Sequence, residues 1–254
     1  LTTTGKGASA GYATTGGIIT LDSTKISVGG DAYTFDLETA RMNLKNIDTI
    51  TNSGLLALTH TIGILNIESS KVKGSIANKA DFGRNGYFDV SLTDSIWSGD
   101  ANSNASVSEA MININLDNRS LWNVTGDSYT NGALVNNGAV NFGSSKEEGF
   151  KEVSVNNYSA DGGVLVMKTD LNNKEKSDLL LVKGAAAGKS AINVYNTAPS
   201  GAERSNALVK VMGDSANAEF VLRNPDIVIN NVAYSSAGAW KYRLENGSLY
   251  PGST

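Results

Sequence analysis

Two short segments contain residue types that hydrolases and nucleotide-binding proteins use for chemistry. Gly7-Ala8-Ser9-Ala10-Gly11 has the spacing G-x-S-x-G, which in many hydrolases places a nucleophilic serine on a strand-to-helix turn. The segment 184–190, Gly-Ala-Ala-Ala-Gly-Lys-Ser, is similar to a phosphate-binding loop but is one residue too short. No helix signal follows either segment, so we interpret both matches as chance and expect neither activity.

A short sequence repeat in the first half of the chain predicts the strands that position its polar side chains. An apolar, a polar, a large aliphatic and a polar residue are followed by Ser, Asn or Asp at 19–23, 42–46, 65–69, 90–94 and 114–118. Strict alternation of this kind is typical of a strand rather than a helix. The rest of each repeat is rich in Gly, Thr and Asn, which disfavours leucine-rich repeats and propeller blades. We therefore predict an all-β fold, a right-handed parallel β-helix whose coils stack about 4.8 Å apart.

Two columns of residues define the register of this predicted solenoid. The central aliphatic residues should pile up in its dry interior, and their positions differ by 23, 23, 25 and 24; they are Leu21, Leu44, Ile67, Leu92 and Leu116. The small polar residues after each strand tolerate left-handed backbone and can hydrogen-bond their own turn or the next coil; they are Ser23, Asn46, Ser69, Asp94 and Asn118. Trp97 and Trp122, 25 residues apart, are interpreted as stacked core or edge aromatics rather than as platforms for a sugar.

Acidic residues at equivalent positions of the repeat suggest an alternative chemistry. Polysaccharide lyases and hydrolases, some of which are β-helical, act through Asp and Glu side chains that converge on one exposed face. Asp94 and Asp117 lie one predicted coil apart, and Glu68 shares its position in the repeat with Asp117. The same position in other coils holds Asp22, Lys45 and Thr93. This mixture favours a solvated face with pairing between coils, and a β-helical polysaccharide lyase or hydrolase remains the alternative function.

Composition excludes several classes of partner and site. The chain has 254 residues, a formal net charge of -4 and no cluster of Lys and Arg, which argues against nucleic acid as a partner. One histidine and no cysteine leave no usual zinc site and no disulfide framework, and we expect no metal and no cofactor. No apolar run approaches the roughly 20 residues of a membrane span. We expect Leu1 to begin a processed or excised piece.

The last hundred residues carry a family resemblance. Segments 149–158, 162–167, 177–182, 192–194, 207–211, 220–222 and 238–244 occur in an order that resembles the autochaperone segment of pertactin-like autotransporter passengers. The resemblance implies a passenger that is secreted or held at the cell surface of a Gram-negative bacterium, with the translocator β-barrel of its own precursor as a partner. It also implies that the C-terminal coils fold first and template the rest. The closing segment Ser248-Leu249-Tyr250-Pro251 departs from the family's usual Trp-x-Leu strand.

On this basis we predict two parts: coils in 1–145, and an autochaperone-like cap and folding nucleus in 146–254. The alternative is that residues 146–254 form further coils with no special role in folding. Dense aliphatics at 164–167 and 179–182 suit strands covered on both faces or a hairpin that caps the open end. The predicted nucleus residues are Phe150, Val153, Val155, Tyr158, Gly163, Leu179, Leu181, Trp240, Tyr242 and Leu244.

Some autotransporter passengers resembling this one carry a serine hydrolase marked by Gly-Asp-Ser before Gly or Leu. Here Gly-Asp-Ser at 126–128 and 213–215 precedes Tyr129 and Ala216, and His60 is the only candidate base. We therefore predict a non-enzymatic stalk with an adhesive surface. Its partner would be a host cell-surface receptor, a matrix component or another copy of itself. Candidate contact loops are Asn78–Gly86, Asp100–Glu109 and Asn172–Ser177.

Overall fold

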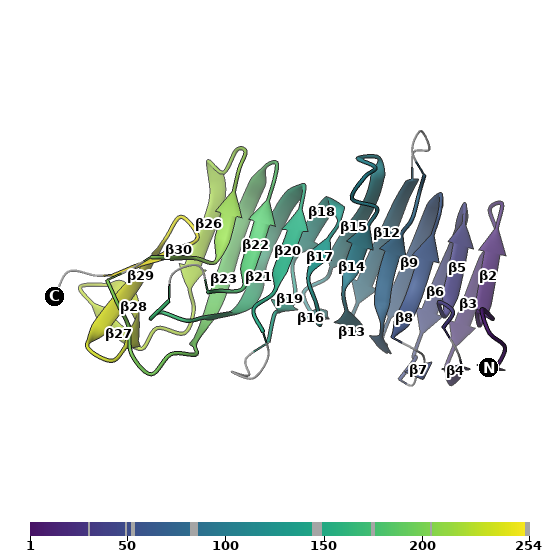
Figure 1. Ribbon diagram of the computed structural model, residues 1–254, viewed down its shortest axis with the longest axis horizontal. Coiled ribbons are helices and arrows are strands. Elements are labelled where there is room, and N and C mark those ends of the chain that lie inside the picture. The colour runs from purple at the N-terminus through teal and green to yellow at the C-terminus, as the bar shows by residue number, and fades with distance from the viewer. Residues whose placement is uncertain are drawn as a thin grey trace.

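The computed structural model describes residues 1–29, 31–48, 50–51, 54–81, 86–143, 149–173, 176–203 and 205–251. In these residues every regular element is a β-strand, and the strands form an elongated solenoid with the N-terminus at one end and the C-terminus at the other (Figure 1). No helix that is long and apolar enough to span a membrane occurs among them. The predicted parallel β-helix is confirmed.

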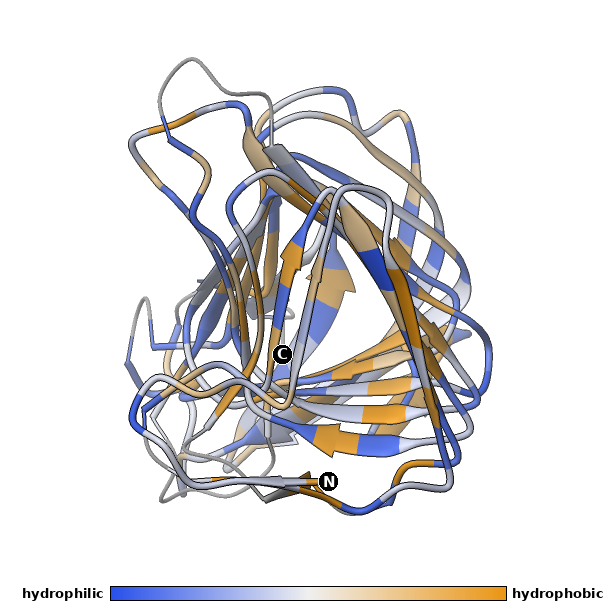
Figure 2. Cartoon of the chain, turned by 90° about the vertical axis from the view of Figure 1, so that its right-hand side faces the viewer, coloured by the Kyte–Doolittle hydropathy of each residue, from blue (hydrophilic) through white to orange (hydrophobic). Residues whose placement is uncertain are grey.

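Each coil contributes strands to a three-sided tube, which is visible along its long axis in Figure 2. The first face is a nine-stranded parallel sheet of β2 (Gly11–Thr14), β5 (Phe35–Glu38), β8 (Leu55–Thr59), β11 (Ser75–Asn78), β14 (Ala101–Ser103), β17 (Ser128–Tyr129), β20 (Glu152–Val155), β22 (Leu179–Val182) and β25 (Val209–Val211). The second face is formed by β3 (Ile18–Asp22), β6 (Ala40–Lys45), β9 (Ile62–Glu68), β12 (Gly86–Thr93), β15 (Ala110–Leu116), β18 (Asn131–Asn136), β21 (Asn157–Thr169), β23 (Ala186–Asn196) and β26 (Asn217–Leu222).

The third face is shorter at first and then merges with the second. Its strands are β1 (Thr2–Thr3), β4 (Ile26–Val28), β7 (Ile50–Thr51), β10 (Lys71–Lys73), β13 (Ile96–Gly99), β16 (Leu121–Val124) and β19 (Ala139–Asn141). From the seventh coil on, a single long strand serves both faces, because β21 pairs with β18 through residues 157–159 and with β19 through residues 164–166. Gly163 lies at this corner, where a Cβ atom would meet the carbonyl oxygen of Asn136 at 1.9 Å.

The predicted interior column is present, residue for residue. Leu21 lies beside Leu44, Leu44 beside Ile67, Ile67 beside Leu92, and Leu92 beside Leu116 in the parallel ladder. Leu21 is partly buried at the open first coil, and the other four are fully buried in one continuous apolar core. Alternating hydropathy along the strands therefore has the expected cause, since one face of each strand lines the core and the other faces solvent.

The predicted turn column holds for four of its five residues. Ser23, Asn46, Ser69 and Asp94 have φ between 48° and 53°, the left-handed region expected for such residues. Asn118 lies outside this column and corrects the prediction. The turn between β15 and β16 is one residue longer than the turn before it, since Leu92 pairs with Leu116 but Ile96 pairs with Leu121.

A buried serine ladder follows the turn column and was not predicted. The Oγ atoms of Ser70, Ser95 and Ser120 accept hydrogen bonds from the backbone N–H groups of Ile47 (2.9 Å), Ser70 (3.1 Å) and Ser95 (3.3 Å), each one coil earlier. The three serines are buried, so their hydroxyls satisfy amide groups that no ladder bond reaches. Next to them, the rings of Trp97 and Trp122 stack in the core with centroids 4.9 Å apart.

A small antiparallel sheet closes the C-terminal end of the tube. It contains β24 (Asn206–Ala207), β27 (Ile227–Ile229), β28 (Val232–Ala237), β29 (Trp240–Glu245) and β30 (Ser248–Pro251), in the order β24-β30-β29-β28-β27. Tyr242 and Leu249 are fully buried and join the solenoid core. The Tyr242 hydroxyl accepts a hydrogen bond from the N–H of Ala202 (2.8 Å). This sheet is the C-terminal β cap expected from the sequence.

The serine ladder generates a stability prediction. In Ser95→Ala the buried N–H of Ser70 loses its acceptor, so we expect the free energy of unfolding to fall by about 1–3 kcal/mol. Urea unfolding followed by circular dichroism measures this loss. Ser91→Ala, on the outer face of the same coil, is the matched control and should change it by less than about 0.5 kcal/mol. Equal losses for the two variants would contradict a structural role for the ladder.

Candidate functional site

The acidic residues highlighted by the repeat are each engaged with a partner in a neighbouring coil. Glu68 pairs with Lys45 at 2.9 Å, and Asp94 lies 3.7 Å from Arg119. Burial acts to raise the pKa of Asp117, but hydrogen bonds from the Ser120 hydroxyl and from two backbone N–H groups outweigh it and lower this pKa. A carboxylate held in its charged form by such bonds is poorly suited to act as a general acid.

Asp22, at the N-terminal end of the same row, is also engaged between coils. Hydrogen bonds from Asn46 and from Ser23 lower the pKa of this carboxyl group. The row therefore pairs along the solenoid axis, as the mixed charges of the repeat indicated.

The candidate hydrolase residues are positioned by different coils. His60 follows β8 in the third coil, Ser128 is in β17 of the sixth, and Ser215 precedes β26 in the ninth. With about 4.8 Å between coils, three coil spacings put His60 about 14 Å from the level of Ser128 along the axis. Ser128 is fully buried, and its Oγ accepts a hydrogen bond from the N–H of Ala101 at 3.1 Å. Its role is structural.

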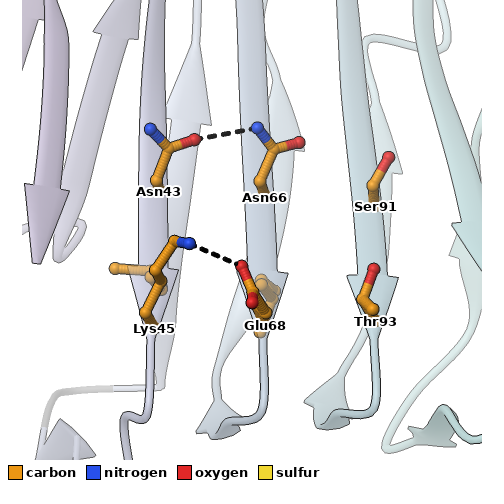
Figure 3. Close-up of a pocket in the computed structure, with 8 residues that line it drawn as sticks. Asn43, Lys45, Asn66, Glu68, Ser91 and Thr93 are labelled. Carbon is orange, nitrogen blue, oxygen red and sulfur yellow. Dashed lines mark hydrogen bonds and ion pairs between the residues drawn. The ribbon is translucent and has the colours of Figure 1, made fainter. Parts of the chain in front are cut away.

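A polar trough lies on the outer side of the second face (Figure 3). Its outward side chains come from β6, β9 and β12 and form two rows across the strands. The first row is Asn43, Asn66 and Ser91, and the second is Lys45, Glu68 and Thr93. Asn66 donates to the Oδ1 atom of Asn43 at 2.8 Å, and Asn43 donates to Thr20 at 3.0 Å. The hollow measures about 380 Å³ and offers amide, hydroxyl and charged groups in a regular array.

The predicted contact loops are partly structural. Asn78 is fully buried, and its side-chain amide donates to the carbonyl oxygens of Gly86 and Met111. Val107, in the loop 100–109, packs with Ala80 and Ala110 in a small separate cluster, so the loops of two successive coils support each other. Residues 82–85 and 174–175 of the other predicted loops lie outside the described residues.

The predicted nucleus residues differ in burial. Val153, Val155, Tyr158 and Tyr242 are buried in the core. Phe150 is exposed, while Leu179, Leu181, Trp240 and Leu244 are only partly buried. For Leu179 and Leu181 this corrects the expectation of a strand covered on both faces. Their neighbours Leu180 and Val182 point inward, because burial alternates along β22. The predicted boundary between 145 and 146 falls in 144–148, outside the described residues.

A buried charged cluster in the C-terminal coils was missed by sequence reasoning. Asp178 is fully buried and accepts hydrogen bonds from the backbone N–H groups of Lys151 (2.9 Å) and Lys168 (2.6 Å). The buried Lys168 ammonium group donates to the carbonyl oxygen of Gly149 (3.0 Å), and that of Lys151 donates to Phe142 (2.6 Å). The cluster thus links segments of two coils. Charged residues are assigned to the surface by default, so no local pattern in the sequence signals the cluster.

The cluster gives Asp178 an unusual titration. Burial raises the pKa of its carboxyl group from 3.8 to about 6, against the opposing effects of the hydrogen bonds and the two ammonium groups. The folded protein therefore binds this proton more tightly than the unfolded chain does. Between about pH 4 and pH 6, the contribution of Asp178 to the free energy of unfolding must fall as the pH rises.

We predict that Asp178→Asn removes this pH dependence. Relative to the variant, the wild type should lose on the order of 1–2 kcal/mol of unfolding free energy when the pH rises from 4 to 7. Urea unfolding at pH 4, 5, 6 and 7 measures it. Asp117→Asn is the matched control with the opposite sign, because the lowered pKa of Asp117 stabilises the fold above about pH 4 and is lost on acidification. Parallel profiles for Asp178→Asn and the wild type would contradict the prediction.

Comparison with known proteins assigns the C-terminal half. Residues 130–244 match the family model described as Autochaperone Domain Type 1. Over 227 residues, 85% of the chain, the sequence is 28% identical to the Escherichia coli (strain K12) protein YuaQ, which is described as uncharacterized, and covers 15% of its length. Over 137 residues, 52% of the chain, it is 29% identical to immunoglobulin A1 protease autotransporters of Haemophilus influenzae and covers 8% of their length. The chain thus spans a small part of each relative.

Proposed function

We propose that this chain, an autotransporter passenger segment with a type 1 autochaperone domain in residues 130–244, is a non-enzymatic surface stalk with an adhesive outer face. In this proposal it is secreted or held at the surface of a Gram-negative bacterium, and its C-terminal part nucleates folding during secretion. The observation that carries the proposal is that the matched segment coincides with the end of the solenoid that is closed by its own cap.

The dimensions support a stalk. Nine strands on the first face give eight spacings of about 4.8 Å, so the coils extend for about 40 Å. Among the described residues, one continuous apolar core runs from Ala13 to Leu249 along the interior of the tube. We therefore place binding on the outside of the tube.

The C-terminal cap supports nucleation from that end. Each coil must bury its open end against a formed neighbour, so the first coil to form carries the largest cost. At the C-terminal end, the buried Tyr242 and Leu249 provide that neighbour from the cap sheet. We therefore place the start of folding at this end.

The name of the Haemophilus relatives includes a protease activity, which we do not extend to this chain. The shared region is 8% of their length. The Asp94, Asp117 and Glu68 side chains that would serve a lyase or hydrolase are engaged with partners in neighbouring coils. Adhesion through the outer side chains is the function that this arrangement supports best.

Two buried leucines test the nucleation. Leu180→Ala and Leu92→Ala each remove a fully buried side chain and should each lower the free energy of unfolding by about 2–5 kcal/mol. We expect Leu180→Ala to slow refolding by at least about tenfold, and Leu92→Ala chiefly to speed unfolding. Stopped-flow refolding from urea measures both rates.

The outward Leu181 provides the control, since Leu181→Ala changes the neighbouring residue of the same strand without opening the core. Its refolding rate should stay within about twofold of the wild type. If Leu92→Ala slows refolding as much as Leu180→Ala does, the C-terminal coils have no privileged role.

The adhesive role predicts saturable binding of the fluorescently labelled chain to cultured epithelial cells, which excess unlabelled chain abolishes. Analytical ultracentrifugation of the same sample separates binding to host cells from association between copies. Binding to neither cells nor copies would contradict adhesion. Release of reducing ends or unsaturated products from polysaccharides would contradict the non-enzymatic part of the proposal and favour the lyase or hydrolase.

A further inference from the structure

An apolar groove with a single guanidinium group lies on the outer face beside the polar trough. It is a hollow of about 310 Å³ across β3, β6, β9 and β12, and its walls include Ile18, Arg41, Ile62, Ile64 and Tyr87. These are outward positions of strands whose inward neighbours form the core, so no part of the solenoid interior accounts for their apolar character. Ile18 is 63% exposed and Tyr87 is 36% exposed.

The register places these side chains in one patch. Arg41 pairs in the ladder with Ile18 on one side and with Ile64 on the other, and Tyr87 pairs with Ile62 on the next strand. Arg41 thus projects between two isoleucines. Within the described residues its guanidinium group is in no ion pair, whereas Lys45, the next outward cation of the same strand, pairs with Glu68. Arg41 is thus a bidentate donor outside any ion pair of the described residues, next to apolar and aromatic surface. The acidic residue of the same row, Asp89 beside Ile64, accepts a hydrogen bond from the side-chain amide of Asn113 at 2.8 Å.

We propose that this groove binds a carboxylated sugar within an acidic glycan, which deepens the adhesive role proposed above and rests on it. The carboxylate would take both N–H edges of Arg41, and the C–H face of the sugar ring would pack on Tyr87 and the isoleucines. A sugar has both a hydroxylated edge and an apolar ring face, and the outer side chains of β6 and β9 provide complements to both. No neutral apolar ligand would use Arg41.

The adjoining trough supports a glycan chain rather than a single sugar or a peptide. Asn43 lies two residues after Arg41 on β6, and Asn66 two residues after Ile64 on β9, so groove and trough share the same strands (Figure 3). Side-chain amides both donate and accept, which suits sugar hydroxyls. β6 and β9 each pair with a strand on both sides, so their backbone has no free edge for adding a peptide strand.

The rim of the groove includes a left-handed turn. Thr39, which lines it, has φ 53°, and its backbone N–H donates to the hydroxyl of Thr61 at 3.1 Å. The equivalent Thr15 one coil earlier has φ 52°, so this left-handed threonine turn repeats at the corner between the first and second faces. It places two threonine hydroxyls beside the apolar floor.

The test is calorimetric titration of the whole chain with a hyaluronan hexasaccharide, which carries uronic acid carboxylates and no sulfate. We expect measurable binding to the wild type and at least about tenfold weaker binding to Arg41→Gln and to Tyr87→Ala. Arg223→Gln, which removes an exposed arginine of the ninth coil, is the matched control and should bind within about twofold of the wild type. A neutral chitin hexasaccharide should bind at least about tenfold more weakly than hyaluronan.

Three outcomes would overturn the inference: no binding of the hexasaccharide to the wild type, equal weakening by Arg41→Gln and Arg223→Gln, or tighter binding of an acidic peptide of matched charge. The cell-binding experiment distinguishes failure of the proposed glycan site from failure of the proposed adhesive role. If cells bind the wild type and Arg41→Gln equally, adhesion stands and the glycan site falls. If cells bind neither, while the hexasaccharide still distinguishes Arg41→Gln, the site stands without the adhesive role.

Discussion

Coil-on-coil stacking is the interaction on which the rest of this structure depends. Every strand of the three faces is parallel to its neighbour one coil away, and every inward residue lies on its equivalent in that coil. A coil on its own would leave its ladder bonds and one surface of its apolar side chains open to water. Each coil therefore gains its burial free energy from its neighbours. A terminal coil lacks one neighbour and needs other contacts to cover its open surface.

From the sixth coil on, buried polar groups add directional hydrogen bonds to the apolar stacking. Asn136 takes the place of the interior aliphatic that follows Leu116, and its amide donates to the hydroxyl of the buried Tyr158 (3.2 Å). That hydroxyl also lies 2.7 Å from Ser190. With Asp178 and Lys168, these bonds join coils through groups whose partners are fixed in direction. A directional network restricts the register of coils more than aliphatic contacts do.

Structural features that repeat at a regular interval could be predicted from the sequence. Features that interrupt this interval could not. The column from Leu21 to Leu116 could be read directly, because five equivalent residues had only one compatible period. Asn118 was misplaced because a one-residue insertion changes the turn without changing the strands around it. Leu179 and Leu181 were misjudged because four consecutive aliphatics carry no alternation from which an inward face can be chosen. The Asp178 cluster depends on contacts between distant segments and had no local pattern.

The candidate binding surface was missed for a related reason. Alternating hydropathy predicts polar residues at outward positions, and Ile18 and Ile64 are isolated exceptions when each strand is considered alone. Only the ladder register brings them beside Arg41 and shows that the exceptions are neighbours. A solenoid turns a single outward residue per coil into a row with a fixed spacing, so a few substitutions in successive repeats suffice to create a continuous contact surface. Because the inward residues are committed to stacking, the outer rows are free to change without cost to the fold, and that is where specificity for a partner can arise.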